Sequence, residues 1–193
     1  MKALQSAVDA RLQGRINRIS CRRCNERDAV VLVYSYSDQD PGRYWIYRPD
    51  REQWQSAGAT RKDIVPARMA TLDFKRIKTR DGADLPLWLT TPAKSAGASA
   101  PPAAVVLVHG GPWVRGGHWR WDEDAQFLAS RGYVVIEPEF RGSTGYGEAH
   151  FRAGWKQWGG LMQDDVADAV KWAADQGLID PKRVCIAGAS YGG

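Results

Sequence analysis

The residues Gly188-Ala189-Ser190-Tyr191-Gly192 have the G-x-S-x-G spacing that places a nucleophilic serine at a sharp strand-to-helix turn. Small residues let such a turn close without clashes and leave the serine hydroxyl exposed. An apolar, strand-like run directly precedes the motif, as this geometry requires. Taken alone, the pattern is equally compatible with a glycine-rich turn whose serine is merely polar.

A second segment could supply the other half of such a site. The run VLVHGGPW, residues 106–113, reads as the end of an apolar strand followed by a glycine-rich loop. Acyl transfer needs two backbone N–H groups aimed at the oxyanion that develops during attack. We expect one from Tyr191, the residue after the serine, and one from Gly111, where glycine lets the backbone approach the substrate closely.

All the histidines of the sequence, His109, His118 and His150, precede Ser190. In hydrolases of this architecture the histidine that acts as base follows the serine in the chain. We therefore expect none of the three to be the base, and we expect His109 to shape its loop.

The elements needed to position these residues follow from a change of pattern after residue 102. Apolar strand-like runs at 103–112, 133–140 and 180–190 alternate with helical patterns at 121–132 and 159–177. This order of strand, helix, strand, helix, strand predicts an α/β fold with a mostly parallel sheet and helices on its faces.

The first part of the chain has a different pattern. Residues 16–56 contain short strands and turns, with strands expected at 29–37 and 44–50. A single hairpin is marginally stable, so we expect this segment to belong to a larger all-β unit. Two more strands are expected at 70–80 and 85–92. A small, proline-containing linker is expected to follow at residues 93–102.

Four segments together resemble the catalytic domain of the prolyl oligopeptidase family, in its acylaminoacyl-peptidase and dipeptidyl-aminopeptidase-like branch. The resemblance covers residues 69–193, and its order of motifs makes it specific. The segments are HGGPW (109–113), EFRGSTGYG (139–147), QDDVADAVKW (163–172) and GASYGG (188–193).

The resemblance implies a serine peptidase that acts on short peptides, with Ser190 as nucleophile and Gly111 and Tyr191 as oxyanion donors. It implies a structural role for Arg141, which would brace the loop near the site. It also implies two domains. Residues 1–68 would be the tail of a β-propeller, and residues 69–193 the N-terminal half of an α/β-hydrolase domain.

The family's aspartate and histidine lie beyond the serine motif, where this sequence has only one further residue. We therefore expect the chain to be an internal fragment and to be inactive on its own, because a serine without its base is an ordinary alcohol. We also expect the strand that leads to Ser190 to form an exposed apolar edge.

The composition is that of a globular protein, with 44% hydrophobic and 25% charged residues and a net charge of +5. The basic residues are scattered singly, which argues against a nucleic-acid partner. No run of 18 apolar residues predicts a membrane span, and the N-terminus has no signal-peptide pattern, so we expect a cytoplasmic location. The oligomeric state is left open.

The three cysteines predict no metal or redox site. Cys21 and Cys24 form a lone C-x-x-C motif, and Cys185 lies in an apolar strand. A zinc site would need a second pair, and a thioredoxin-like motif would open a helix. We expect chance or structural cysteines in a reducing compartment. The GSTGYG segment lacks the spacing of a phosphate-binding loop, so no cofactor is expected.

Two alternatives remain open. A carboxylesterase of the same fold would share both glycine-rich motifs, but this alternative does not explain the β-rich segment at residues 16–56. A non-catalytic binding protein derived from a decayed gene is the second alternative. Its arginines and tryptophans could stack on bases, although they fit the packing of an active-site loop better.

Overall fold

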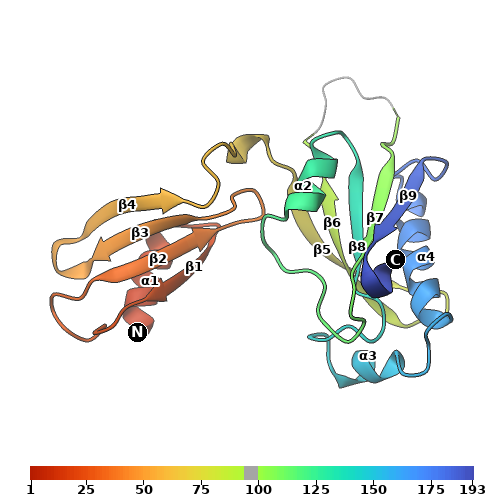
Figure 1. The fold of residues 1–193 in the computed structure, drawn as a ribbon, viewed down its shortest axis with the longest axis horizontal. Helices are drawn as coiled ribbons and strands as arrows, with labels where there is room; N and C mark the ends of the chain where they lie inside the picture. The colour runs from red at the N-terminus through yellow and green to blue at the C-terminus, as the bar shows by residue number, and fades with distance from the viewer. Residues whose placement is uncertain (94–99) are drawn as a thin grey trace. The chain divides into compact units, whose positions relative to one another are not determined.

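The computed structural model describes residues 1–93 and 100–193 and divides them into two compact units. The first comprises residues 1–69 with 120–122, and the second comprises 70–119 with 123–193 (Figure 1). The linker expected at residues 93–102 falls largely on 94–99, outside the described residues.

The first unit is a four-stranded antiparallel sheet with one helix. Its strands are hydrogen-bonded in the order β1-β2-β3-β4, each to the next along the chain. Short 3-10 turns at Pro49–Arg51 and Pro66–Arg68 follow β3 and β4. The other elements are α1 (Lys2–Arg11), β1 (Ile16–Ser20), β2 (Val31–Tyr36), β3 (Arg43–Arg48) and β4 (Gln53–Ala59).

Helix α1 packs on one face of this sheet. Val8 is fully buried against Val31, Val33 and Tyr47. The expected strands of the hairpin are confirmed, and Tyr47 points into the core as the strand alternation requires. Helix α1 was not predicted, because its amphipathic signal is weak: Val8 is its one buried residue and Leu4 is only partly buried against the same core.

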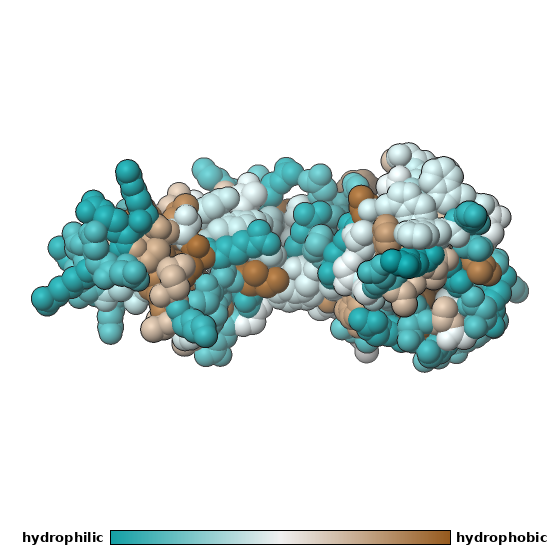
Figure 2. Space-filling view, turned by 90° about the horizontal axis from the view of Figure 1, so that it is seen from below, coloured by the Kyte–Doolittle hydropathy of each residue, from teal (hydrophilic) through white to brown (hydrophobic). Residues whose placement is uncertain are grey.

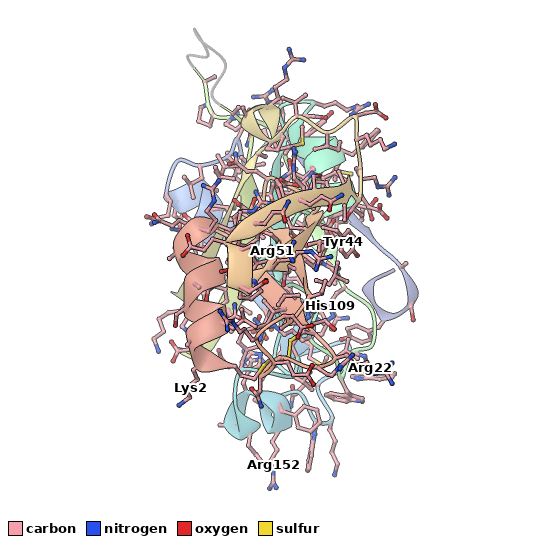
Figure 3. All side chains as sticks on the ribbon, turned by 90° about the vertical axis from the view of Figure 1, so that its left-hand side faces the viewer. Lys2, Arg22, Tyr44, Arg51, His109 and Arg152 are labelled. Atoms are coloured by element: carbon pink, nitrogen blue, oxygen red, sulfur yellow. A yellow bond between two sulfur atoms is a disulfide. The ribbon has the colours of Figure 1, made fainter. Side chains whose placement is uncertain are left out.

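The two N-terminal cysteines have a structural role, one of the two outcomes expected from the sequence. Cys21 and Cys24 form a disulfide within the loop that joins β1 to β2. Arg22, which stands between them, is labelled in Figure 3. The pairing is geometrically simple because the two Cα atoms are 5.4 Å apart, within the range that a disulfide spans. A disulfide gives no support to a reducing compartment.

The second unit is a five-stranded mixed sheet in the order β5-β6-β8-β7-β9. Strand β7 runs parallel to β8 and β9, whereas β5, β6 and β8 pair antiparallel. The α/β class is confirmed, but the expected parallel arrangement holds only for β7, β8 and β9. A tight turn joins β5 to β6 and forces that pair to be antiparallel. The bounds are β5 (Thr71–Lys78), β6 (Asp84–Thr91), β7 (Ala104–Val108), β8 (Val134–Pro138) and β9 (Val184–Gly188).

Three helices accompany this sheet: α2 (Glu123–Ala129), α3 (Glu148–Ala153) and α4 (Leu161–Asp175). The longest, α4, buries Ala169 and Ala173 against Leu85, Leu87 and Ile136 of the sheet. The helical spacing of its apolar residues predicts this face correctly. No helix among the described residues is long and apolar enough to cross a membrane.

Strand β9 lies at the edge of the sheet (Figure 1). Ile186 is 64% exposed, whereas Val106 of the neighbouring β7 is 1% exposed. An apolar groove of about 700 Å³ lies beside β9 and is lined by β7, β9, α4 and the C-terminal turn. The exposed apolar edge expected from the sequence is therefore present.

Candidate active site

Ser190 occupies the corner between β9 and a short 3-10 turn, Ser190–Gly192. Its φ is +60°, in the left-handed region that residues with a side chain rarely adopt. Such strain concentrates at functional sites, and a nucleophilic serine on a strained strand-to-helix turn is one instance. The backbone at Ser190 therefore has the form that the G-x-S-x-G motif predicts.

The two glycines of the motif are required by close backbone contacts. A Cβ atom on Gly192 would collide with the carbonyl oxygen of Val108 at the end of β7. A Cβ atom on Gly188 would collide with the carbonyl oxygen of Gly192 and lie 2.9 Å from that of Val108. The turn can therefore fold back against β7 only because both positions lack a side chain.

The glycine-rich loop after β7 borders the serine. A Cβ atom on Gly110 would lie 3.2 Å from the carbonyl oxygen of Ala189 and 3.8 Å from Oγ of Ser190. The next residue, Gly111, has a φ of +123° and precedes Pro112 through a cis peptide bond. The structure thus brings the two glycine-rich segments together, and the oxyanion role of Gly111 stays a prediction.

Tyr191 is half-buried, and its ring lies among other aromatic side chains. Its hydroxyl donates to Sδ of Met162 at 3.5 Å, and its ring centroid lies 5.3 Å from Phe140 and 5.4 Å from Trp158. Burial raises the pKa of the Tyr191 hydroxyl. The side chain is therefore held in place, and the role of its backbone N–H as an oxyanion donor stays a prediction.

His109 is held by its own loop. Its Nε2 lies 3.0 Å from Oγ of Ser143, its Nδ1 lies 2.7 Å from the carbonyl oxygen of Gly110, and its ring stacks on Phe140 at 4.3 Å. His109 belongs to the second unit and is labelled in Figure 3. These contacts fit the loop-shaping role expected from the sequence.

Glu139 is a site residue that sequence reasoning missed. It is 1% exposed, and its carboxylate accepts hydrogen bonds from the backbone N–H groups of Gly116 and Gly117. Nε2 of His109 lies 3.8 Å from the same carboxylate. The sequence contained a signal for this role, because Glu139 directly follows an apolar strand. A carboxylate buried at such a position must accept hydrogen bonds from nearby donors.

Arg141 braces the segment that follows β8. Its guanidinium and backbone N–H both donate to the carboxylate of Asp165 on α4, and the guanidinium also donates to Asp81 in the β5–β6 turn. The side chains of Arg141 and Asp165 are 7% and 2% exposed. The hydrogen bond from Arg141 holds the pKa of Asp81 well below its usual range. The structural role implied for Arg141 fits these contacts.

Residues 1–93 and 100–193 do not assemble a catalytic triad of serine, histidine and aspartate around Ser190. Within these ranges no hydrogen bond to the Ser190 hydroxyl is found, and His150 directs Nε2 at the carbonyl oxygens of Glu139 and Phe140. The same ranges contain no group of three or more His, Cys, Asp or Glu side chains that could hold a metal ion.

Comparison with known proteins finds peptidases. Residues 119–193 match the model of the prolyl oligopeptidase family. The chain is 46% identical over 127 residues to dipeptidyl aminopeptidase BIII of Pseudoxanthomonas mexicana. The aligned segment covers 61% of this chain and 18% of that protein. It is 36% identical over 168 residues to the uncharacterized peptidase YuxL of Bacillus subtilis, covering 86% and 25% of the two chains.

Comparison with solved structures also finds a peptidase. A puromycin-hydrolyzing peptidase of Mycobacterium tuberculosis superposes with a TM-score of 0.71 at 26% identity, covering 84% of this chain and 26% of that one. The chain spans about 18 to 28% of the length of the first curated relatives it matches. The resemblance predicted from the motifs is thus confirmed: residues 119–193 match the prolyl oligopeptidase family, and the relatives named here are peptidases.

Proposed function

We propose that this chain supplies the nucleophile and the oxyanion-binding groups of a serine peptidase that acts on short peptides. Ser190 is the nucleophile, and the backbone N–H groups of Gly111 and Tyr191 are the oxyanion donors. The observation that carries the proposal is the strained φ of +60° at Ser190, on a turn packed beside the loop at Gly110.

The reaction would proceed through an acyl-enzyme. Oγ of Ser190 attacks the peptide carbonyl carbon while a base accepts its proton, and the carbonyl oxygen becomes an oxyanion. Donors fixed in advance at Gly111 and Tyr191 stabilise that charge. Collapse of the intermediate breaks the C–N bond and releases the protonated amine, and water then hydrolyses the ester.

The two-domain arrangement is part of the proposal. We assign residues 1–68 to the end of a β-propeller, because the first unit is a four-stranded antiparallel sheet with its strands in chain order, like a propeller blade. Residues 69–193 are assigned to an α/β-hydrolase domain. The β-sheet unit favours a peptidase over the alternative carboxylesterase.

The 193-residue chain by itself is expected to show no serine-dependent turnover, because no described residue serves Ser190 as base. The test compares hydrolysis of a dipeptidyl p-nitroanilide by the chain and by its Ser190→Ala variant. Equal rates at the level of buffer are expected. A rate that falls on substitution would contradict this expectation.

The function itself is best tested in a chimera, in which residues 70–193 replace the corresponding segment of dipeptidyl aminopeptidase BIII. We expect the chimera to retain peptidase activity and to lose at least about 10³-fold of it on Ser190→Ala. Ser130→Ala is the matched control, because its exposed hydroxyl hydrogen-bonds only to neighbouring residues just after the C-terminal end of α2. An active Ser190→Ala chimera would refute the proposal.

A further inference from the structure

Five aromatic side chains form a continuous row that begins at Tyr191, next to the proposed nucleophile. Trp158 lies 5.4 Å from Tyr191, and Trp113 lies 6.5 Å from Trp158. Phe151 then contacts Trp113 at 5.8 Å and Trp155 at 6.0 Å, all between ring centroids. We call this row of Tyr191, Trp158, Trp113, Phe151 and Trp155 the aromatic shelf.

Three tryptophans of the shelf are exposed to solvent over a large part of their side chains. Trp158 is 62% exposed, Trp155 is 50% exposed and Trp113 is 37% exposed. Exposed single hydrophobic side chains are ordinary, but a contiguous group of them marks an interaction surface. Seen from below, the second unit has a broad surface area of intermediate hydropathy (Figure 2).

The backbone that carries Phe151 and Trp155 packs tightly on the segment after β8. A Cβ atom on Gly154 would lie 2.6 Å from the carbonyl oxygen of Arg141, so the turn that carries the tryptophans packs tightly on the segment after β8. The backbone N–H of Gly142 donates to the carbonyl oxygen of His150 at 3.0 Å, which joins the segment after β8 to α3. Lys156, between Trp155 and Trp158, has a φ of +60°. Pre-organised aromatic surfaces bind with little loss of conformational entropy.

The aromatic shelf lies next to the proposed nucleophile. Ser190 and the loop at Gly110 lie at the carboxyl ends of β9 and β7, the end of a parallel sheet where ligands bind in this fold class. Tyr191 joins the shelf directly to that end. Helix α3, which carries Phe151, lies at the same end of the second unit as the C-terminal turn (Figure 1).

We propose that the aromatic shelf is a subsite that binds an aromatic side chain of the peptide whose carbonyl group is presented to Ser190. This inference rests on the proposed function. An aromatic side chain can stack on Trp158 and Trp155 and remove their exposed faces from water. A basic side chain fits less well, because the Arg152 guanidinium, paired with Glu148, already lies 5.3 Å from the centroid of the Trp155 ring and competes for that face.

The experiment measures peptide binding to the 193-residue chain through the indole N–H signals of its tryptophans in ¹H–¹⁵N NMR spectra. The probes are the tripeptides Gly-Phe-Gly, Gly-Lys-Gly and Gly-Gly-Gly. Signals of Trp113, Trp155 and Trp158, assigned from single Trp→Phe variants, are expected to shift with Gly-Phe-Gly. We expect at least fivefold weaker binding of the other two peptides.

Substitution then locates the subsite. Trp158→Ala is expected to weaken Gly-Phe-Gly binding about five- to tenfold, the size of one aromatic stack with its buried area. Trp155→Ala serves as a second variant, since both side chains are at least half exposed and their removal opens no buried cavity. Phe127→Ala is the matched control. Phe127 is 57% exposed and lies under Arg131, as Trp155 lies under Arg152, but it belongs to α2.

The outcomes separate this inference from the proposed function. Equal binding of Gly-Phe-Gly and Gly-Gly-Gly, or equal losses in Trp158→Ala and Phe127→Ala, would overturn the subsite. Ser190→Ala is expected to leave binding unchanged, since stacking does not use the hydroxyl. In the chimera, Trp158→Ala should raise KM for a phenylalanyl substrate with little change in kcat. Activity that survives Ser190→Ala refutes the nucleophile, whereas the binding result stands independently.

Discussion

Removal of Arg141 from its buried ion pair with Asp165 is expected to cost more stability than removal of Arg152 from its exposed pair with Glu148. Four hydrogen bonds leave the Arg141 side chain, two to Asp165 and two to Asp81. Arg141→Met keeps most of the aliphatic stem but leaves the Asp165 carboxylate, 2% exposed, without its cation. Breaking a buried pair in this way costs about 3–5 kcal/mol.

This loss is measurable by urea unfolding of the chain. With an m-value of about 2 kcal/mol/M, the midpoint should fall by about 1.5–2.5 M. Arg152→Met is the matched control. Arg152 pairs with Glu148 on the surface of α3, where the side chains are 61% and 70% exposed, and the pair contributes at most about 0.5 kcal/mol. Figure 3 shows Arg152 extending away from the protein.

A double variant tests the cause of the loss. Arg141→Met with Asp165→Asn removes the unpaired charge, while the amide oxygen can still accept the backbone N–H of Arg141. We expect the double variant to recover part of the lost stability. Equal midpoints for Arg141→Met and Arg152→Met, or a double variant less stable than Arg141→Met, would refute the reasoning.

Three further perturbations test other parts of the structure. Ile186→Lys should reduce concentration-dependent light scattering and leave the urea midpoint unchanged, because its side chain is 64% exposed on an edge strand; unchanged scattering would contradict this. Gly192→Ala should lower the chimera's peptidase rate more than tenfold through a collision with Val108, whereas Gly160→Ala, with no atom nearer than 3.4 Å, should not. The lowered pKa of Asp81 contributes stability above about pH 4 that is lost as the pH falls through the folded value. Asp81→Asn should therefore lose less stability than the parent chain between pH 5 and pH 2, measured by urea midpoints, and an equal loss would exclude this linkage.

Much of the second unit could be predicted from the sequence, because local patterns there agree with the tertiary structure. The strands β5 to β9 and helix α4 follow from periodicity, and the glycine spacing of the motif at Ser190 follows from close backbone contacts. Helix α3 was missed because its six residues include no buried side chain. Helices this short depend on tertiary contacts rather than on local propensity.

The residues that support the site were harder to predict. The pairing of Glu139 with the N–H groups of Gly116 and Gly117, and of Arg141 with Asp165, joins segments that are far apart in sequence. Periodicity carries no information about such pairs. The Cys21–Cys24 disulfide was missed for a related reason, since a lone C-x-x-C motif does not reveal its redox state.

The most direct test of the central claim is the site of covalent labelling by an active-site-directed fluorophosphonate. The chimera that carries residues 70–193 would be treated with the reagent, digested and mapped by mass spectrometry. An activated nucleophile at the strained turn predicts a single phosphonylated peptide that contains Ser190, with labelling abolished in Ser190→Ala. Labelling at another serine, or labelling that persists in Ser190→Ala, would contradict the account.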